Sequence, residues 1–342
     1  MDESEEEIKL LSGKDFKPIC IPFVGGRGSG KTAFIAAFNG EIYGLEERCG
    51  WNIERYDNRD ESDYQKYQYD LLLYYFMGYT INTIKYIKTI KTSCPIRYTI
   101  TGNEFYSIRS ILLYDVAGEF FTGKEDIVVN KEYEYCNGLV IVIDPFSIDS
   151  IHSKYSQNLS EYDAKMICRD DTYEVITNFI NQLHDLTGLH LADALEVPTA
   201  VVISKTDVKG LREILGLDAI RESMESNGFK NEMDTEDYIC RKFLYENGLA
   251  NVVNIIDTKF PNNRFFACSA IGHEVMDAEN IDFDKSRFTP IGVMDTMQWL
   301  FNQIDFATKV KWNDKKFTKK PQYREGKNNS GPFRKIRKLW RK

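Results

Sequence analysis

The stretch IPFVGGRGSGKTAFIAAFNG, Ile21–Gly40, decides the fold. It contains the spacing GxxxxGKT over Gly25–Thr32, and glycine is used where a backbone must bend tightly or approach a ligand closely. Ile19–Val24 has the apolar composition of a buried strand, and Thr32–Phe38 has that of a helix. In such a loop, backbone N–H groups point at a phosphate, and the helix N-terminus favours the negative charge. The stretch therefore predicts a phosphate-binding loop; the alternative is a chance glycine turn.

Three side chains of this loop suit the chemistry of a nucleoside triphosphate. Lys31 would reach the outer phosphates and neutralise developing charge, and the Thr32 hydroxyl would bind Mg²⁺. Arg27 either supplies a positive charge to the transition state or is an ordinary exposed arginine. We expect nucleotide contacts from the whole loop and the residue after it: Gly25, Gly26, Arg27, Gly28, Ser29, Gly30, Lys31, Thr32 and Ala33.

The bulk composition is that of a globular protein. The chain has 342 residues and a formal net charge of −8. No uninterrupted apolar stretch is long enough to span a bilayer, and the acidic start MDESEEEIK differs from a signal peptide. Seven scattered cysteines without a CxxC pair favour a reduced, cytoplasmic compartment. Four histidines without metal-site spacing argue against a histidine-based metal centre.

Charge divides the chain into three parts. We predict an acidic, disordered lead-in over residues 1–14, one enlarged α/β domain over 15–312, and a basic tail over 313–342. The tail carries a net charge of +10 and leaves −18 on the rest. Its end, FRKIRKLWRK, has apolar residues at helical spacing, which suits an anionic membrane, an acidic partner surface or RNA. A solvated tail, or one folded onto the acidic body, is the alternative.

Strand and helix patterns alternate through the large domain, with insertions expected near residues 45–80, 145–190 and 209–261. Near-continuous β-branched runs are typical of parallel strands buried on both faces. Beyond the first strand, we expect strands over Pro95–Gly102, Ser107–Asp115, Gly138–Asp144, Thr199–Lys205 and Arg264–Ala270. We expect helices over Tyr69–Gly78, Asp171–Gly188 and Thr289–Val310. This order predicts a doubly wound α/β sheet.

An acidic motif follows the strand that ends at Asp115. Ligands of α/β sheets sit at the carboxyl ends of strands, and a carboxylate near a phosphate loop suits Mg²⁺. The sequence DVAGE therefore makes Asp115 a candidate metal ligand and lets the Gly118 N–H approach a γ-phosphate. Without the phosphate loop, an ordinary strand-end turn would explain this motif equally well.

Two further motifs follow later strands. In SKTD, the Asp207 carboxylate can accept hydrogen bonds from N1–H and the 2-amino group of guanine, and the Lys205 stem can cover the base. In CSAIG, Ser269, Ala270 and Ile271 can offer a backbone N–H to the guanine oxygen. Ser204, Asp207 and Ser269 could instead be helix N-caps. The order of the four motifs, each at a predicted strand end, favours the nucleotide interpretation.

With GGRGSGKT, DVAGE, SKTD and CSAIG, the chain resembles the P-loop GTPases of the TRAFAC group over about residues 19–304. GYTINT, VIDPFS, RFFACSAIG and PIGVMDTMQWLF are similar to the bacterial double-GTPase type, which is often found in conflict or signalling systems. The resemblance implies a P-loop NTPase three-layer sandwich with a mostly parallel sheet, a Ras-like G domain with helical insertions. It also implies GTP or GDP and Mg²⁺ as ligands.

Several residues depart from the GTPase pattern. Ser204 stands where asparagine is common, so its hydrogen bonding to the loop is less extensive. Glu119 stands where small GTPases use glutamine to orient water, so it either orients water or repels the γ-phosphate; Arg27 is its nearest candidate partner. Thr83 in GYTINT is our choice for the switch I ligand of Mg²⁺, with Thr80, Thr89 and Thr92 as competitors.

These features predict a GTP-hydrolysing molecular switch in the cytoplasm that is slow alone and is controlled by an unknown protein partner. Lys31, Glu119 and Arg27 are its candidate catalytic residues. One alternative is an assembly module that holds the nucleotide with negligible hydrolysis. Another is a nucleotide kinase, which ranks last because no arginine-rich lid is visible. Peripheral membrane contact through the tail is a further expectation.

Overall fold

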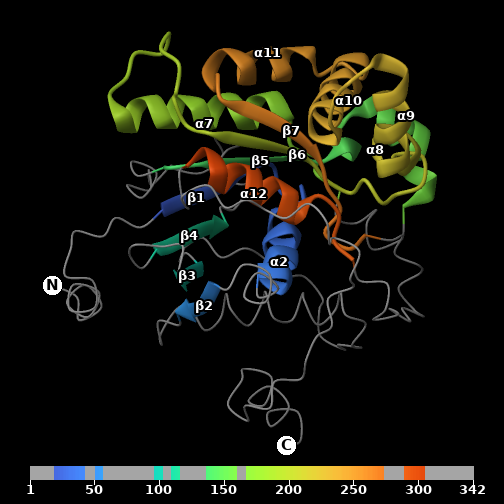
Figure 1. Ribbon diagram of the computed structural model, residues 1–342. Coiled ribbons are helices and arrows are strands. Elements are labelled where there is room, and N and C mark those ends of the chain that lie inside the picture. The colour runs from blue at the N-terminus through green and yellow to red at the C-terminus, as the bar shows by residue number, and fades with distance from the viewer. Residues whose placement is uncertain are drawn as a thin grey trace, which may run out of the picture. The chain divides into compact units, whose positions relative to one another are not determined.

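The computed structural model describes residues 19–42, 51–56, 96–102, 109–115, 136–159, 167–272 and 289–304 (Figure 1). Several predictions lie outside these residues: the acidic lead-in, the helix over residues 69–78, the basic tail, and most of the insertion near 45–80. The candidates Gly118, Glu119 and Thr83, with its competitors, also lie outside them.

The described strands form one sheet of seven in the order β2-β3-β4-β1-β5-β6-β7. Their bounds are β1 (Ile19–Val24), β2 (Trp51–Tyr56), β3 (Ile96–Gly102), β4 (Arg109–Asp115), β5 (Leu139–Ile143), β6 (Thr199–Ile203) and β7 (Asn263–Ala267). β4, β1, β5, β6 and β7 are parallel, whereas β2 and β3 are antiparallel to their neighbours. The predicted α/β class with a mostly parallel sheet is therefore confirmed.

Strand β1 lies at the point where the strand order reverses, because the chain goes from β1 to the β2–β4 side and then returns to β5. In open α/β sheets, ligands bind in the crevice outside the carboxyl ends of the strands at such a point. The glycine-rich stretch follows β1 directly, so the topology puts it in this crevice.

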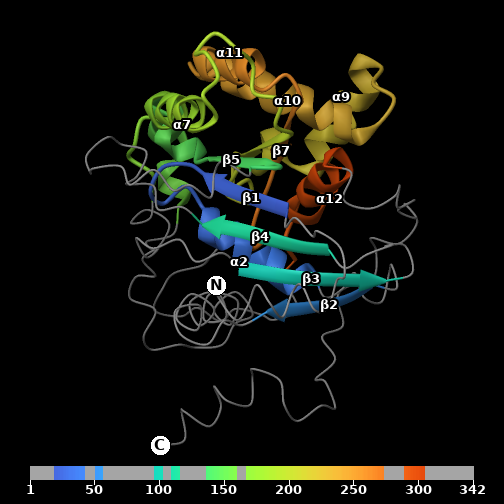
Figure 2. The same ribbon diagram turned by 90° about the vertical axis from the view of Figure 1, so that its left-hand side faces the viewer.

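Helices cover both faces of the sheet. Their bounds are α2 (Lys31–Ile42), α5 (Asp149–Tyr155), α7 (Thr172–Thr187), α8 (Arg212–Leu215), α9 (Leu217–Asn227), α10 (Glu232–Glu246), α11 (Ala250–Lys259) and α12 (Val293–Gln303), with short 3₁₀ turns at Pro145–Ser147 and Ser156–Asn158. On one face, the ring of Phe23 packs against Phe34 of α2. On the same face, the ring of Phe266 packs against Trp299 of α12. In Figure 2, α2 lies behind β4.

The opposite face carries the largest hydrophobic cluster. Successive strand residues point to opposite faces, so Val24 and Phe265, the neighbours of Phe23 and Phe266, join this second cluster. There they pack with the buried residues of α7, α10 and α11. Figure 1 shows α8–α11 gathered beside β6 and β7, so the sequence between these two strands is helical.

Helix α7 confirms the prediction for Asp171–Gly188. The Asp171 side chain is the N-cap and accepts a hydrogen bond from Glu174 N at 2.9 Å. Gly188 ends the helix in the left-handed region with φ +68°, a conformation that glycine adopts without the cost a Cβ would bring. Asp171 therefore fixes where α7 begins, and Gly188 fixes where it ends.

Two acidic side chains of α10 cover the outer edge of β7. Glu236 Oε1 accepts from Ala267 N at 2.9 Å, and Asp237 Oδ1 accepts from Phe265 N at 2.8 Å. An edge strand exposes unpaired backbone groups, and these two side chains satisfy donors that no other strand among the described residues pairs. Burial is the main cause that raises the pKa of Glu236, to about 8.

Three sequence expectations need correction. The closing helix begins at Val293 rather than Thr289, because Thr289 N donates to Ile271 O and Gly292, with φ +73°, precedes the first helical turn. The last strand ends at Ala267 rather than Ala270. Strand β2 falls inside the expected insertion near 45–80, where we predicted no strand.

Among the helices that the structure describes, none combines the length and the apolar character needed to cross a membrane.

Candidate functional site

The phosphate-loop candidate joins β1 to α2 in a conformation that needs glycine. Gly30 has φ +102°, which side chains other than glycine rarely adopt. A Cβ on Gly25 would lie only 2.4 Å from the carbonyl oxygen of Val142 in β5, so the loop must pass close to the neighbouring strand. The first α2 hydrogen bond, from Phe34 N to Gly30 O at 2.9 Å, closes the turn.

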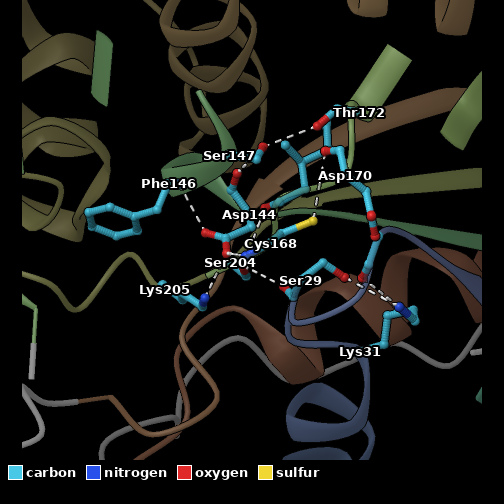
Figure 3. A network of polar contacts seen from close by, with 12 residues as sticks. Ser29, Lys31, Asp144, Phe146, Ser147, Cys168, Asp170, Thr172, Ser204 and Lys205 are labelled. Carbon is cyan, nitrogen blue, oxygen red and sulfur yellow. Dashed lines mark hydrogen bonds and ion pairs between the residues drawn. The ribbon is translucent and has the colours of Figure 1, made fainter. Parts of the chain in front are cut away.

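Lys31 is buried under this loop, although lysine is rarely buried. Its Nζ donates to Gly25 O at 2.6 Å and to Gly26 O at 2.9 Å, and it lies 3.5 Å from Ser29 Oγ. Figure 3 shows its ammonium directed toward the loop beside Ser29. The positive charge is therefore held inside the curve of the loop, where an anion bound by the loop would meet it.

Thr32 and Asp115 meet although 83 residues separate them in the sequence. Thr32 Oγ1, in the first turn of α2, donates to Asp115 Oδ2 at 2.6 Å. Asp115 ends β4 and pairs in register with Phe23 of β1, so the parallel pairing brings the carboxylate to the loop. A hydroxyl and a carboxylate are hard oxygen ligands of the kind Mg²⁺ prefers. These two residues therefore fit the predicted metal site, in which they would be the protein ligands.

The end of β6 contacts the loop from the other side. Ser204 Oγ lies 2.8 Å from Ser29 O and 3.2 Å from Ile143 O, and it can donate its single proton to either. The predicted contact between Ser204 and the loop is thus present. A Cβ on Gly30 would lie 3.4 Å from Ser204 Cβ, so the two segments are closely packed.

Asp207 and the CSAIG segment lie at adjoining strand ends. Thr206 N donates to Cys268 O at 3.3 Å, which joins the turn after β6 to the turn after β7. Ser269 Oγ accepts from Ile271 N and Gly272 N, so it closes its own turn around Ala270. The next helix after β6 has Leu211 as its N-cap residue and lacks a side-chain cap, so neither Ser204 nor Asp207 caps it.

Asp144 was not predicted as a functional residue, yet it joins three segments beside the loop. It is 1% exposed. Its carboxylate accepts from Phe146 N and Cys168 N, both at 2.9 Å, and pairs with Lys205 Nζ at 2.7 Å. Figure 3 shows it at the centre of this network. Lys205 has φ +57°, an unusual backbone for a residue with a side chain. Asp144 therefore holds Lys205, whose side-chain stem is predicted to cover the nucleotide base.

Asp170 is a second residue that the sequence did not indicate. Its Oδ2 accepts from Arg27 N of the loop at 2.7 Å, across 143 residues of sequence. The Arg27 residue itself is exposed. Cys168, two residues before Asp170, is buried beside the loop, and burial is the main cause that raises the pKa of its thiol to about 11. The thiol is therefore neutral at physiological pH.

The loop, Asp115, the SKTD turn and the CSAIG turn thus all lie at the carboxyl edge of the parallel strands. No protein-family model matches the chain, and no curated protein matches it significantly. The resemblance to P-loop GTPases therefore depends on these four motifs and on the way the fold gathers them.

Proposed function

We propose that this chain is a GTP-binding, Mg²⁺-dependent molecular switch built on a Ras-like P-loop domain, a three-layer sandwich. The hydrogen bond of 2.6 Å between Thr32 Oγ1 and Asp115 Oδ2 carries the proposal. It joins the phosphate loop to the acidic motif of a different strand, and this pair is what a nucleotide-bound Mg²⁺ requires on the protein side.

The loop supplies the phosphate site. Backbone N–H groups between Gly25 and Thr32 bind the phosphate oxygens, and the N-terminal end of α2 adds a favourable dipole. Lys31 has three protons, so it can share them between the loop carbonyls and the outer phosphates. Thr32 and Asp115 would hold a Mg²⁺ ion, which would supply charge neutralisation for the phosphates.

The turns after β6 and β7 supply the base site. The Asp207 carboxylate accepts from N1–H and the 2-amino group of guanine, a pair of donors that adenine lacks at that edge. The Lys205 stem covers the base plane, held by its ion pair of 2.7 Å with Asp144. The backbone of Ser269–Ile271 provides donors for the guanine oxygen. Selection of guanine thus depends on a carboxylate that is 8% exposed in this turn.

Turnover is proposed to be slow without a partner, because glutamate stands at position 119, where small GTPases use glutamine to orient water. Charge supplied by a partner raises turnover by roughly 10³–10⁵-fold in related systems. Phosphate release measured with and without candidate partners separates this proposal from an assembly module that holds its nucleotide.

Calorimetry with GDP and ADP in Mg²⁺ tests nucleotide binding. We expect the wild-type protein to bind GDP and not ADP. Asp207→Ala should weaken GDP binding by about 2 kcal/mol or more, because a charge-assisted contact is lost. Lys31→Ala should abolish triphosphate binding, measured in the same way with a non-hydrolysable GTP analogue. Asp185→Ala, which removes an exposed carboxylate of α7, is the matched control and should change nothing. Equal affinities for GDP and ADP would contradict the proposal.

A further inference from the structure

The segment that leads into α7 packs directly on the phosphate loop. Cys168 N is anchored to Asp144 Oδ2 at 2.9 Å, which holds the segment beside the end of β5. A Cβ on Gly26 would lie 2.4 Å from Cys168 Sγ and 3.0 Å from Asp170 Oδ2. Only a residue without a side chain leaves room for this contact, so Gly26 and the segment fit each other.

The contact places a carboxylate on the backbone of the loop. Asp170 Oδ2 accepts from Arg27 N at 2.7 Å, a short distance for an N–H···O bond. The glycine-rich loop attracts anions through its N–H groups, and Asp170 is an anion that the chain itself supplies.

This carboxylate lies at the same part of the loop as the lysine ammonium. Lys31 Nζ contacts the carbonyl oxygens of Gly25 and Gly26, and Asp170 approaches Gly26 and Arg27. In phosphate loops the lysine binds the outer phosphates, so a γ-phosphate held by Lys31 is brought toward Asp170. Figure 3 shows Lys31 and Asp170 on the same side of Ser29.

From this arrangement we infer that Asp170 is a specificity-determining residue, which sets the preference of the site for guanosine diphosphate over the triphosphate. The inference rests on the proposed function. The triphosphate adds negative charge at the γ position, where the Asp170 carboxylate repels it. The diphosphate lacks this group, so the charge of Asp170 affects it less. The preference for diphosphate lengthens the inactive state of the switch.

The test compares dissociation constants of GDP and a non-hydrolysable GTP analogue by calorimetry, at fixed Mg²⁺ and ionic strength. Asp170→Asn keeps an oxygen that can accept from Arg27 N and removes the charge. We expect it to tighten binding of the triphosphate about tenfold relative to the diphosphate, which corresponds to about 1.4 kcal/mol. Asp185→Asn removes one exposed carboxylate near the opposite end of α7 and should leave this ratio unchanged.

Distinct outcomes separate the two proposals. If the wild-type protein binds no guanine nucleotide, the proposed function fails. If it binds both nucleotides but Asp170→Asn leaves the ratio of their dissociation constants unchanged, only the role of Asp170 is overturned. If Asp170→Asn changes both dissociation constants by the same factor, their ratio is also unchanged. This result would overturn the role of Asp170 as well, because it indicates a general shift of the loop. Asp170→Ser also removes the charge and should likewise raise the affinity for the triphosphate relative to the diphosphate. It replaces Asp170→Asn if thermal unfolding shows that Asp170→Asn is unfolded.

Discussion

Replacing Asp144 by alanine tests whether this residue joins β5, the Cys168 segment and the turn after β6. The substitution removes the acceptor of two backbone donors, Phe146 N and Cys168 N, and the partner of Lys205. A buried donor left unsatisfied costs about 1–3 kcal/mol. The side chain of Lys205 is 15% exposed, so its ammonium can turn toward water when Asp144 is removed. Its contribution to the loss of stability is therefore smaller than that of a fully buried charge.

We therefore expect Asp144→Ala to lower the free energy of unfolding by about 3–5 kcal/mol, measured by urea denaturation at pH 7. Lys205→Met keeps the acceptor for both donors, but it leaves a carboxylate that is 1% exposed without this cation, so it should also lower the free energy of unfolding. Asp149→Ala, which removes an exposed carboxylate in the first turn of α5, is the matched control and should cost at most about 1 kcal/mol. A loss below about 1 kcal/mol for Asp144→Ala would refute the reasoning, because the two donors would then have other acceptors.

Burial raises the pKa of Glu236 to about 8 from a usual 4.5, so the folded state retains a proton that the unfolded state loses. The free energy of unfolding should therefore fall as pH rises through this interval, and Glu236→Gln, unlike the exposed Glu246→Gln, should flatten the fall in urea titrations. Gly26→Ala should lower the melting temperature, because a Cβ there would lie 2.4 Å from Cys168 Sγ and 3.0 Å from Asp170 Oδ2; an unchanged melting temperature would mean that the segment is not packed on the loop. Thr32→Ala should reduce the Mg²⁺ dependence of GDP affinity with a smaller effect on Mg²⁺-free binding, and an unchanged Mg²⁺ titration would exclude Thr32 as a ligand.

Local patterns explain why much of this arrangement could be predicted. The glycine spacing and β-branched runs depend on neighbouring residues, and so do the caps of α7, Asp171 and Gly188. The positions of Asp115 and Ser204 followed from a general rule, since the ends of parallel strands meet at one edge of a sheet.

Contacts between distant segments could not be predicted in the same way. Asp170 stands next to Asp171, and the sequence gives no sign that one reaches the loop while the other caps a helix. Asp144 has the position of an ordinary strand-end acid, and only packing joins it to Lys205. Strand β2 lies at the edge of the sheet, where a strand needs no continuous apolar run.

The exchange of base specificity at Asp207 tests the central claim most directly. Xanthine carries an oxygen where guanine has its 2-amino group, so an amide side chain suits xanthine and a carboxylate suits guanine. Calorimetry of the wild-type protein and Asp207→Asn with GDP, xanthosine diphosphate and ADP measures the exchange. We predict that the wild-type protein binds GDP and not xanthosine diphosphate, and that Asp207→Asn reverses this order while neither binds ADP. The same order of affinities in both proteins would contradict the assignment of this edge of the sheet as a guanine nucleotide site.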